Sequence, residues 1–152
     1  MKKSYPFWMI LTLGLFVLAI VFAGAKVTTY ASLPAFLVVV FPPFVLVVAV
    51  HGLAGIGRSF RVAFEGVAAT RQELETGASL FGSLQRYLLL TGLITTMIGL
   101  IAMLANLYEA DGIGPVVALA LITLFYSLMF ILTVAVPFRS ALEKRLIEEA
   151  ND

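Results

Sequence analysis

The sequence predicts an all-α, polytopic membrane protein with four transmembrane helices and with both termini in the cytoplasm. Hydrophobic residues make up 61% of the 152 residues and charged residues only 12%, whereas soluble domains carry about 25% charged residues. Four long runs contain no charge at all, and nearly all basic residues lie on one side of these runs. A run of about 20 apolar residues crosses a bilayer as a helix. We therefore expect one membrane domain over residues 1–152.

The first uncharged run follows Lys2 and Lys3, and it predicts a span over residues 7–25. A basic start, an apolar core and the small residues Ala23-Gly24-Ala25 are also the pattern of a cleavable secretory signal peptide. The apolar run of residues 7–22 is long for a signal core, and further spans follow it. We therefore favour an uncleaved first span.

The second run predicts a span over residues 33–53 that begins with Pro34 in its first turn, where a missing N–H costs nothing. Pro42 and Pro43 lie inside this run, and each removes a backbone hydrogen bond. The pair predicts a kinked helix whose freed carbonyls are covered by neighbouring helices.

The third and fourth runs predict spans over residues 87–108 and 115–138, joined by the acidic turn 109–112. The fourth run again has a proline in its first turn, and it ends near Pro137. A charged, amphipathic tail follows over residues 139–152.

Residues 58–85 form the one substantial polar segment between spans. Apolar residues recur there at helical spacing, which predicts an amphipathic helix that lies at the interface or continues the second span. Glycine and serine at residues 77–83 are expected to break it. A solvated linker helix is the favoured interpretation, and a specific docking surface is the other.

The positive charges predict the orientation. With four spans, nine of the ten basic residues fall on the side of the termini, and only Lys26 falls on the other. The positive-inside rule then places both termini and residues 58–85 in the cytoplasm, with Glu109 and Asp111 outside. The nine residues are Lys2, Lys3, Arg58, Arg61, Arg71, Arg86, Arg139, Lys144 and Arg145.

The absence of membrane charge limits the function classes. A carboxylate in a span would be a functional site by default, and a self-contained proton-coupled carrier normally has one. If this chain moves cations, a partner must supply the ionisable group. No nucleophile–base pair, no cysteine and no histidine cluster are present, so we expect no enzyme, no metal, no cofactor and no nucleic-acid partner.

Hydroxyl side chains are the polar groups that the spans do contain. They include Thr95 and Thr96 on the third span, and Thr123 and Ser127 on the fourth. Gly92 and Gly99 add a small-residue strip, as in packed membrane helices. Helix packing is the favoured interpretation of these residues and pore lining is the alternative; His51, at the end of the second span, is read as an interfacial imidazole rather than a proton relay.

Three stretches of the last two runs resemble the final two spans of the MotA/TolQ/ExbB proton channel family. They are Thr96–Leu107, Ile113–Pro115 and Ala118–Ser127. The resemblance is nearest to the MotA branch of flagellar stators, whose second span is similar to Leu33–Val40. Thr96 matches the family's third-span threonine, and Pro137 matches its proline near the inner end of the fourth span.

This resemblance implies a pentamer in a bacterial inner membrane around two copies of a single-span partner of the MotB/TolR/ExbD type. The partner brings a membrane aspartate, the third and fourth spans line the ion path, and ion flow drives mechanical work. Thr96, Thr123, Thr95 and Ser127 are the implied path residues. Gly92, Gly99, Pro137, Pro42 and Pro43 are then packing or kink positions.

Three departures from the family pattern matter. Leu124 stands where the family has its fourth-span threonine, and Thr123 is one position away, about 100° around the helix. Leu89 replaces the flagellar branch's proline, and the segment 58–85 is much shorter than the rotor-contacting one. Because one hydroxyl is lost, protons are expected rather than sodium. The alternative function is a non-conducting scaffold or accessory subunit. A small-molecule exporter is disfavoured because this chain has no charged residue in a span.

Overall fold

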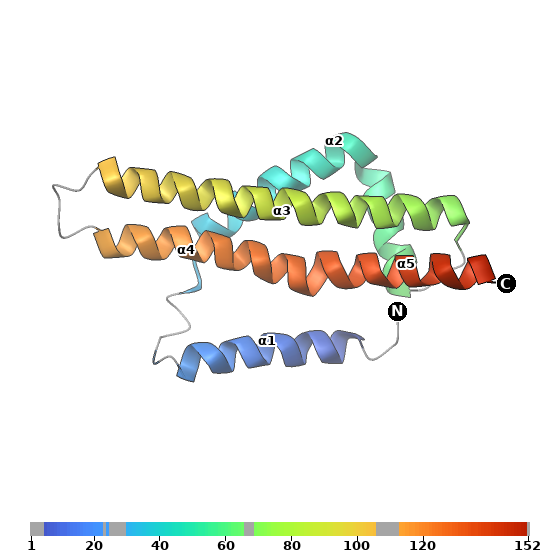
Figure 1. Ribbon diagram of the computed structural model, residues 1–152, viewed down its shortest axis with the longest axis horizontal. Helices are drawn as coiled ribbons and strands as arrows, with labels where there is room; N and C mark the ends of the chain where they lie inside the picture. The colour runs from blue at the N-terminus through green and yellow to red at the C-terminus, as the bar shows by residue number, and fades with distance from the viewer. Residues whose placement is uncertain (1–4, 23, 25–29, 66–68, 106–112, 152) are drawn as a thin grey trace.

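The computed structural model describes residues 5–22, 24, 30–65, 69–105 and 113–151, and within these ranges it contains helices and no strands. Figure 1 shows their arrangement. The predicted all-α fold is confirmed. The elements in order are α1 (Tyr5–Phe22), α2 (Leu33–Glu65), α3 (Arg71–Ala105), α4 (Ile113–Phe130), the π-helical turn η3 (Ile131–Ala135) and α5 (Val136–Asn151).

Three of the described helical stretches are long and apolar enough to cross a bilayer: Leu33–Ala63, Arg71–Ala105 and Gly114–Ala150. A fourth apolar helix, Trp8–Phe22, is shorter. The chain is therefore a multi-pass membrane protein by length and composition. A first span over residues 7–25 stays a prediction.

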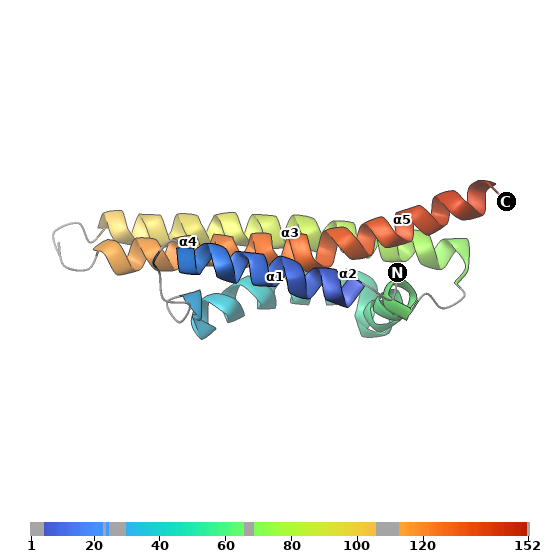
Figure 2. The same cartoon turned by 90° about the horizontal axis from the view of Figure 1, so that it is seen from below.

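Helices α3 and α4 form an antiparallel hairpin, and α5 continues the line of α4 beyond η3 (Figures 1 and 2). Both helical arms of the hairpin, α3 and the α4–α5 line, extend beyond the apolar runs 87–108 and 115–138 into the charged residues that flank them. Asn106, Glu109 and Asp111, which the sequence places near the outer turn, lie outside the described residues.

Beyond the uncharged run 115–138 the chain stays helical, and it passes Pro137 as part of α5. Proline has no N–H to donate to the carbonyl of residue 133. The chain widens into a π turn just before it, where the Val136 N–H donates to the Ile131 carbonyl five residues back. This local adjustment lets the helix pass the proline without a break.

The sharp bend in α2 lies at Gly52. Pro42 and Pro43 keep helical backbone angles, and Pro43 is fully buried. Gly52 has φ 69° and ψ 159°, a conformation that glycine adopts without strain and that other residues avoid. The sharp turn of α2 in Figure 1 follows from this residue.

In residues 58–85 the structure has the continuation of the second helix that the sequence allowed, but not the break expected at residues 77–83. Residues 58–65 continue α2, and a new helix starts at Arg71 and passes Gly77 and Gly82 without interruption. Glu73 caps the start of this helix as in one half of a capping box, because its carboxylate accepts a hydrogen bond from the Thr70 N–H at 3.0 Å. Gly77 does not break the helix: a Cβ there would lie 2.8 Å from a methyl group of Leu142.

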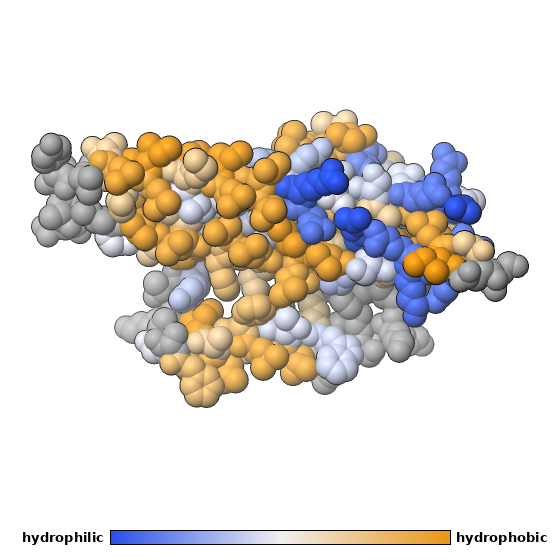
Figure 3. Space-filling view, viewed as in Figure 1, coloured by the Kyte–Doolittle hydropathy of each residue, from blue (hydrophilic) through white to orange (hydrophobic). Residues whose placement is uncertain are grey.

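The charged end of the molecule has a packed core, which we call the lobe: residues 53–65 of α2, residues 71–86 of α3, and α5. Its centre is an aromatic group in which Phe60, Phe81 and Phe138 lie with ring centroids 5.0–5.4 Å apart. The buried residues of this core are Val62, Ala63, Leu74, Leu80, Phe81, Phe138 and Leu142, and Val47 from the preceding part of α2 packs with them. The hydropathy surface changes from orange to blue where the lobe begins (Figure 3).

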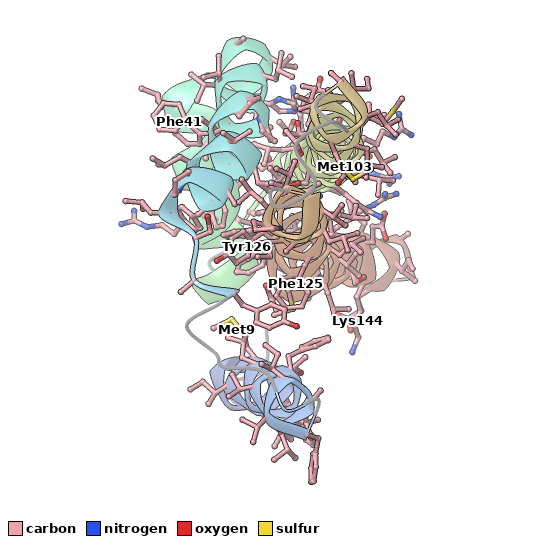
Figure 4. All side chains as sticks on the ribbon, turned by 90° about the vertical axis from the view of Figure 1, so that its left-hand side faces the viewer. Met9, Phe41, Met103, Phe125, Tyr126 and Lys144 are labelled. Carbon is pink, nitrogen blue, oxygen red and sulfur yellow. The ribbon has the colours of Figure 1, made fainter. Side chains whose placement is uncertain are left out.

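Helix α1 lies apart from the others and touches them along one stripe (Figure 4). Met9, Thr12, Phe16 and Ile20 are half-buried at helical spacing, and the other described side chains of α1 are exposed. The Phe16 and Phe125 rings meet edge to face at 6.5 Å. Because α1 is apolar all round, its exposed faces belong in lipid or against another subunit.

Candidate functional site

The seam between α3 and α4 is built on two glycines. A Cβ on Gly92 would lie 2.5 Å from the Cβ of Ser127, and a Cβ on Gly99 would lie 2.6 Å from the Cβ of Ala120. Both distances are too short for any other residue, so the absence of a side chain lets the two helices approach. Close approach through small residues is the usual way that membrane helices associate.

Two hydroxyl groups tie the helices together along this seam. The Thr96 Oγ1 is within hydrogen-bonding distance of both the Gly92 carbonyl, at 2.8 Å, and the Ala120 carbonyl of α4, at 3.0 Å. The Ser127 hydroxyl donates back to the Leu88 carbonyl of α3. Thr96 is 9% exposed and Ser127 is 0% exposed, so both hydroxyls are engaged within their own subunit.

A groove with a volume of about 310 Å³ opens beside the seam, where the start of α2 meets the hairpin. Its lining is apolar except for the side chains of Thr95 and Thr123. The lining residues are Pro34, Ala35, Val38, Thr95, Ile98, Gly99, Ala102, Val116, Leu119, Ala120 and Thr123.

The two groove hydroxyls donate to their own helices. Thr95 Oγ1 donates to the Thr91 carbonyl at 2.7 Å, and Thr123 Oγ1 donates to the Ala120 carbonyl at 2.7 Å. A threonine oxygen that has donated its proton keeps lone pairs that accept a hydrogen bond. The groove therefore offers two acceptor oxygens in an otherwise apolar wall.

The four predicted path residues thus separate into two pairs. Thr95 and Thr123 line the groove, whereas Thr96 and Ser127 hold the seam. Leu124, at the position of the family's threonine, is half-buried, with a methyl group 3.5 Å from the Cβ position of Gly92. The one-residue offset therefore places Thr123 at the groove and the leucine at the seam.

Sequence reasoning noted Tyr126 among the hydroxyls of the fourth span but gave it no role; in the structure it contacts the chain just before α2, the helix that forms the third wall of the groove. Its hydroxyl donates to the Tyr30 carbonyl and accepts the Ser32 N–H at 3.1 Å, so it holds the chain just before α2 against α4. Its ring also meets Phe36 at 6.3 Å. A tyrosine in an apolar run needs a polar partner. Its presence in the sequence could therefore have indicated a hydrogen bond from this helix to another segment.

The seam and the groove contain no charged side chain. Among the described residues, no group of three or more His, Cys, Asp or Glu side chains is placed to hold a metal ion. His51, near the bend of α2, has a buried Nδ1 without a hydrogen-bond partner in the described part of the chain. What the site can offer a cation is hydroxyl oxygen and close helix packing.

The family model of the MotA/TolQ/ExbB proton channel family matches residues 57–152, which cover well over half of the chain. The chain belongs to this family. The match includes all of α3, α4 and α5, and therefore the whole seam and two walls of the groove. No curated protein matches the chain.

Membership identifies the chain as a membrane ion-channel-type subunit of a family that forms membrane complexes. The match begins near the end of α2, so it does not include α1 or the stretch Leu33–Val40. The hairpin is thus the part of the fold that carries the family assignment.

Proposed function

We propose that this chain is a proton-conducting channel subunit that works with a single-span partner of the MotB/TolR/ExbD type. The partner supplies the membrane aspartate, and ion flow through the complex drives mechanical work. We further propose a pentamer in a bacterial inner membrane, with four spans including residues 7–25 and with cytoplasmic termini. The MotA branch with a shortened cytoplasmic segment is the proposed position within the family, and no covalent reaction is catalysed.

The observation that carries this proposal is the groove with two hydroxyls in the uncharged runs of the hairpin. No span contains Asp, Glu, Lys or Arg, so a cation crossing here needs a carboxylate from another chain. Thr95 and Thr123 present the two acceptor oxygens that lie on the groove side. We therefore assign the ion path to these two residues.

Thr96 and Ser127 receive a different role in this proposal. Their hydroxyls join α3 to α4. Thr123 is also buried, at 6% exposed, but its hydroxyl donates to a carbonyl of its own helix α4. Thr96 and Ser127 keep the hairpin rigid, so that the path residues stay in register. This revises the assignment from the family resemblance, in which Thr96 is the leading path residue.

The test is proton flux into proteoliposomes that contain the chain co-purified with its single-span partner. Thr95→Val and Thr123→Val keep the side-chain shape and remove the acceptor oxygens. We expect each to reduce flux about tenfold or more, since a lost hydrogen bond to a charged group corresponds to about 1.5–3 kcal/mol.

Thr12→Val is the matched control, because Thr12 on α1 makes the same bond to its own helix, with its Oγ1 2.8 Å from the Trp8 carbonyl. It should leave flux unchanged. Full flux in both groove variants, with the complex intact, would contradict the path assignment.

One observation favours a second candidate, a non-conducting scaffold subunit. Thr96 is buried against its own subunit, and the groove is apolar apart from two hydroxyls. A scaffold would show no flux with any partner, and Thr95→Val would change nothing. The flux measurement therefore separates the two functions.

A further inference from the structure

Two arginines mark the place where the apolar part of the hairpin meets the lobe. Arg86 is the last charged residue before the uncharged run of α3, and Arg139 is the first after the uncharged run of α4 and η3. Figure 3 shows the change from orange to blue across the middle of α3 and the adjoining helix. This depth corresponds to the headgroup region of a bilayer.

The structure brings these two side chains to the same surface. The Arg139 guanidinium lies across α3 at Gly82, with its Nη1 atom 3.4 Å and its Cζ atom 3.6 Å from the Cβ position of that glycine. Arg86 is four residues after Gly82 on α3, and residues at this spacing share a helix face. Arg86 therefore lies one helical turn along α3 from the position that the Arg139 guanidinium covers.

The cations of the lobe differ in how far they are neutralised. Arg58 pairs with Glu73, Arg71 pairs with Glu75, and Lys144 pairs with Glu148. Arg86 is exposed and makes no ion pair with another residue in the described part of the chain. Among the described residues, the positive charge of Arg86 at the edge of the apolar surface is therefore not balanced by an ion pair.

Arg139 is held so that one side of its guanidinium is available. Its Nε donates to the Glu143 carboxylate at 2.7 Å, and the side chain is 42% exposed. The Nη1 atom lies near Gly82. A guanidinium has five N–H donors, so the bond from Nε to Glu143 leaves donors for a second acceptor. Even with Glu143 counted, the pair Arg86 and Arg139 leaves one net positive charge here.

The apolar surface continues directly from this pair. Leu89 and Leu90 lie three and four residues after Arg86, on the same side of α3, and they are 41% and 55% exposed. A ligand bound at the arginines would meet apolar side chains on the membrane side. A free phosphate ion would use only the charged half of this surface.

We propose that Arg86 and Arg139 bind the phosphate of an anionic phospholipid, whose acyl chains lie along α3 at Leu89 and Leu90. Guanidinium groups form charge-assisted hydrogen bonds with phosphate oxygens, and basic pockets at the cytoplasmic ends of membrane helices are suited to acidic headgroups. Such a lipid would join α3 to α5 at the level where the hairpin enters the lobe. This inference goes beyond the proposed channel function and does not depend on conduction.

The test uses the full chain in a zwitterionic detergent, titrated with phosphatidylglycerol or with phosphatidylcholine and followed by native mass spectrometry. We expect phosphatidylglycerol to bind at least tenfold more tightly than phosphatidylcholine. Arg86→Gln and Arg139→Gln should each weaken that binding about tenfold, the effect of losing one charge-assisted contact. Inorganic phosphate should not compete at the same concentration.

Arg71→Gln is the matched control, because Arg71 is an exposed arginine of α3 about four turns from Arg86. It should bind phosphatidylglycerol as the wild type does. Equal weakening by Arg71→Gln would show diffuse attraction to the basic lobe and overturn the proposal. Competition by inorganic phosphate, or unchanged binding in both site variants, would overturn it as well.

Circular dichroism of each variant establishes that the helices are retained. Arg86→Lys keeps the charge and should retain the preference for the anionic lipid.

Discussion

Gly92 is the residue on which the α3–α4 seam depends most directly. Its missing side chain leaves room for the Ser127 Cβ, which a new methyl group would meet at 2.5 Å. The clashing atom is held by the backbone and cannot rotate away. We expect Gly92→Ala to destabilise the hairpin by about 1–3 kcal/mol, the usual effect of overpacking, as measured by denaturation in mixed micelles.

Gly114→Ala is the control for this prediction, because nothing lies within 4 Å of its Cβ position. Ser127→Gly should partly restore the Gly92→Ala variant by removing the opposing Cβ. Ser127→Ala keeps that Cβ and should not restore it. Equal stability of Gly92→Ala and Gly114→Ala would show that the two helices do not meet at this point.

Glu73 makes the lobe sensitive to acid. The Thr70 backbone N–H, which donates to this carboxylate, and the nearby Arg58 guanidinium lower the pKa of Glu73. Because the folded-state pKa is below the unfolded-state value, the contribution is complete above the ordinary glutamate range. It is lost as the pH falls through the lowered pKa.

The expected result is a melting temperature of the lobe that decreases in this acid window for the wild type and less steeply for Glu73→Gln. Circular dichroism across the window measures it. Glu75→Gln, in which an exposed pair with Arg71 is lost, should leave the slope nearly unchanged. Identical slopes for the wild type and Glu73→Gln would show that Glu73 does not cause the acid sensitivity.

Sequence alone identified the hydroxyl residues of the hairpin but not which of them faces which neighbour. Adjacent residues on a helix point about 100° apart, so Thr95 and Thr96 serve different surfaces. Thr95 lines the groove because Pro34, Ala35 and Val38 of α2 close it on that side. This wall depends on tertiary packing, including the contact from Tyr126 to Tyr30, which no local pattern encodes.

At the level of elements, Gly52 determines the course of α2. Its backbone angles of φ 69° and ψ 159° turn the helix, so that residues 53–65 pack in the lobe. A residue with a Cβ is strained there by about 1–3 kcal/mol. We expect Gly52→Ala to lower the melting temperature of the lobe and to reduce protection of residues 58–65 in hydrogen exchange.

Gly57→Ala is the matched substitution five residues later, at a helical glycine with nothing within 4 Å of its Cβ position. It should be neutral or stabilising by about 0.5–1 kcal/mol. If both alanine variants behave alike, the bend at Gly52 is not needed for the fold.

The helices themselves were predictable because long apolar runs of this kind have few alternatives in lipid. Their ends and bends were less predictable. Pro42 and Pro43 suggested a kink, but only the structure shows that the bend lies at Gly52. Gly77 and Gly82 suggested a break in α3, whereas Leu142 and Arg139 pack over them. A glycine in a helical sequence indicates either a helix break or a close packing contact, and only the neighbouring residues show which.

At the scale of the whole molecule, the described helices leave a large apolar surface exposed after they have packed against one another. Large hydrophobic side chains are exposed on α1, α2, α3 and α4, among them Trp8 at 58%, Phe41 at 63% and Met97 at 60%. Some of this surface belongs in lipid, but an assembled channel would cover part of it. The sequence predicted the membrane and the family, because both follow from composition and from the hairpin motif. It did not determine the assembly, since contacts between subunits have no local pattern in one chain.

The central claim is that the hairpin belongs to a channel complex completed by another chain. Native mass spectrometry of the chain, co-expressed with a single-span neighbour that has a membrane aspartate, tests it most directly. The account predicts a closed homo-oligomer, a pentamer, that retains two copies of the single-span chain. A monomer or dimer that never retains the neighbour would contradict the claim, and the seam would then be packing alone.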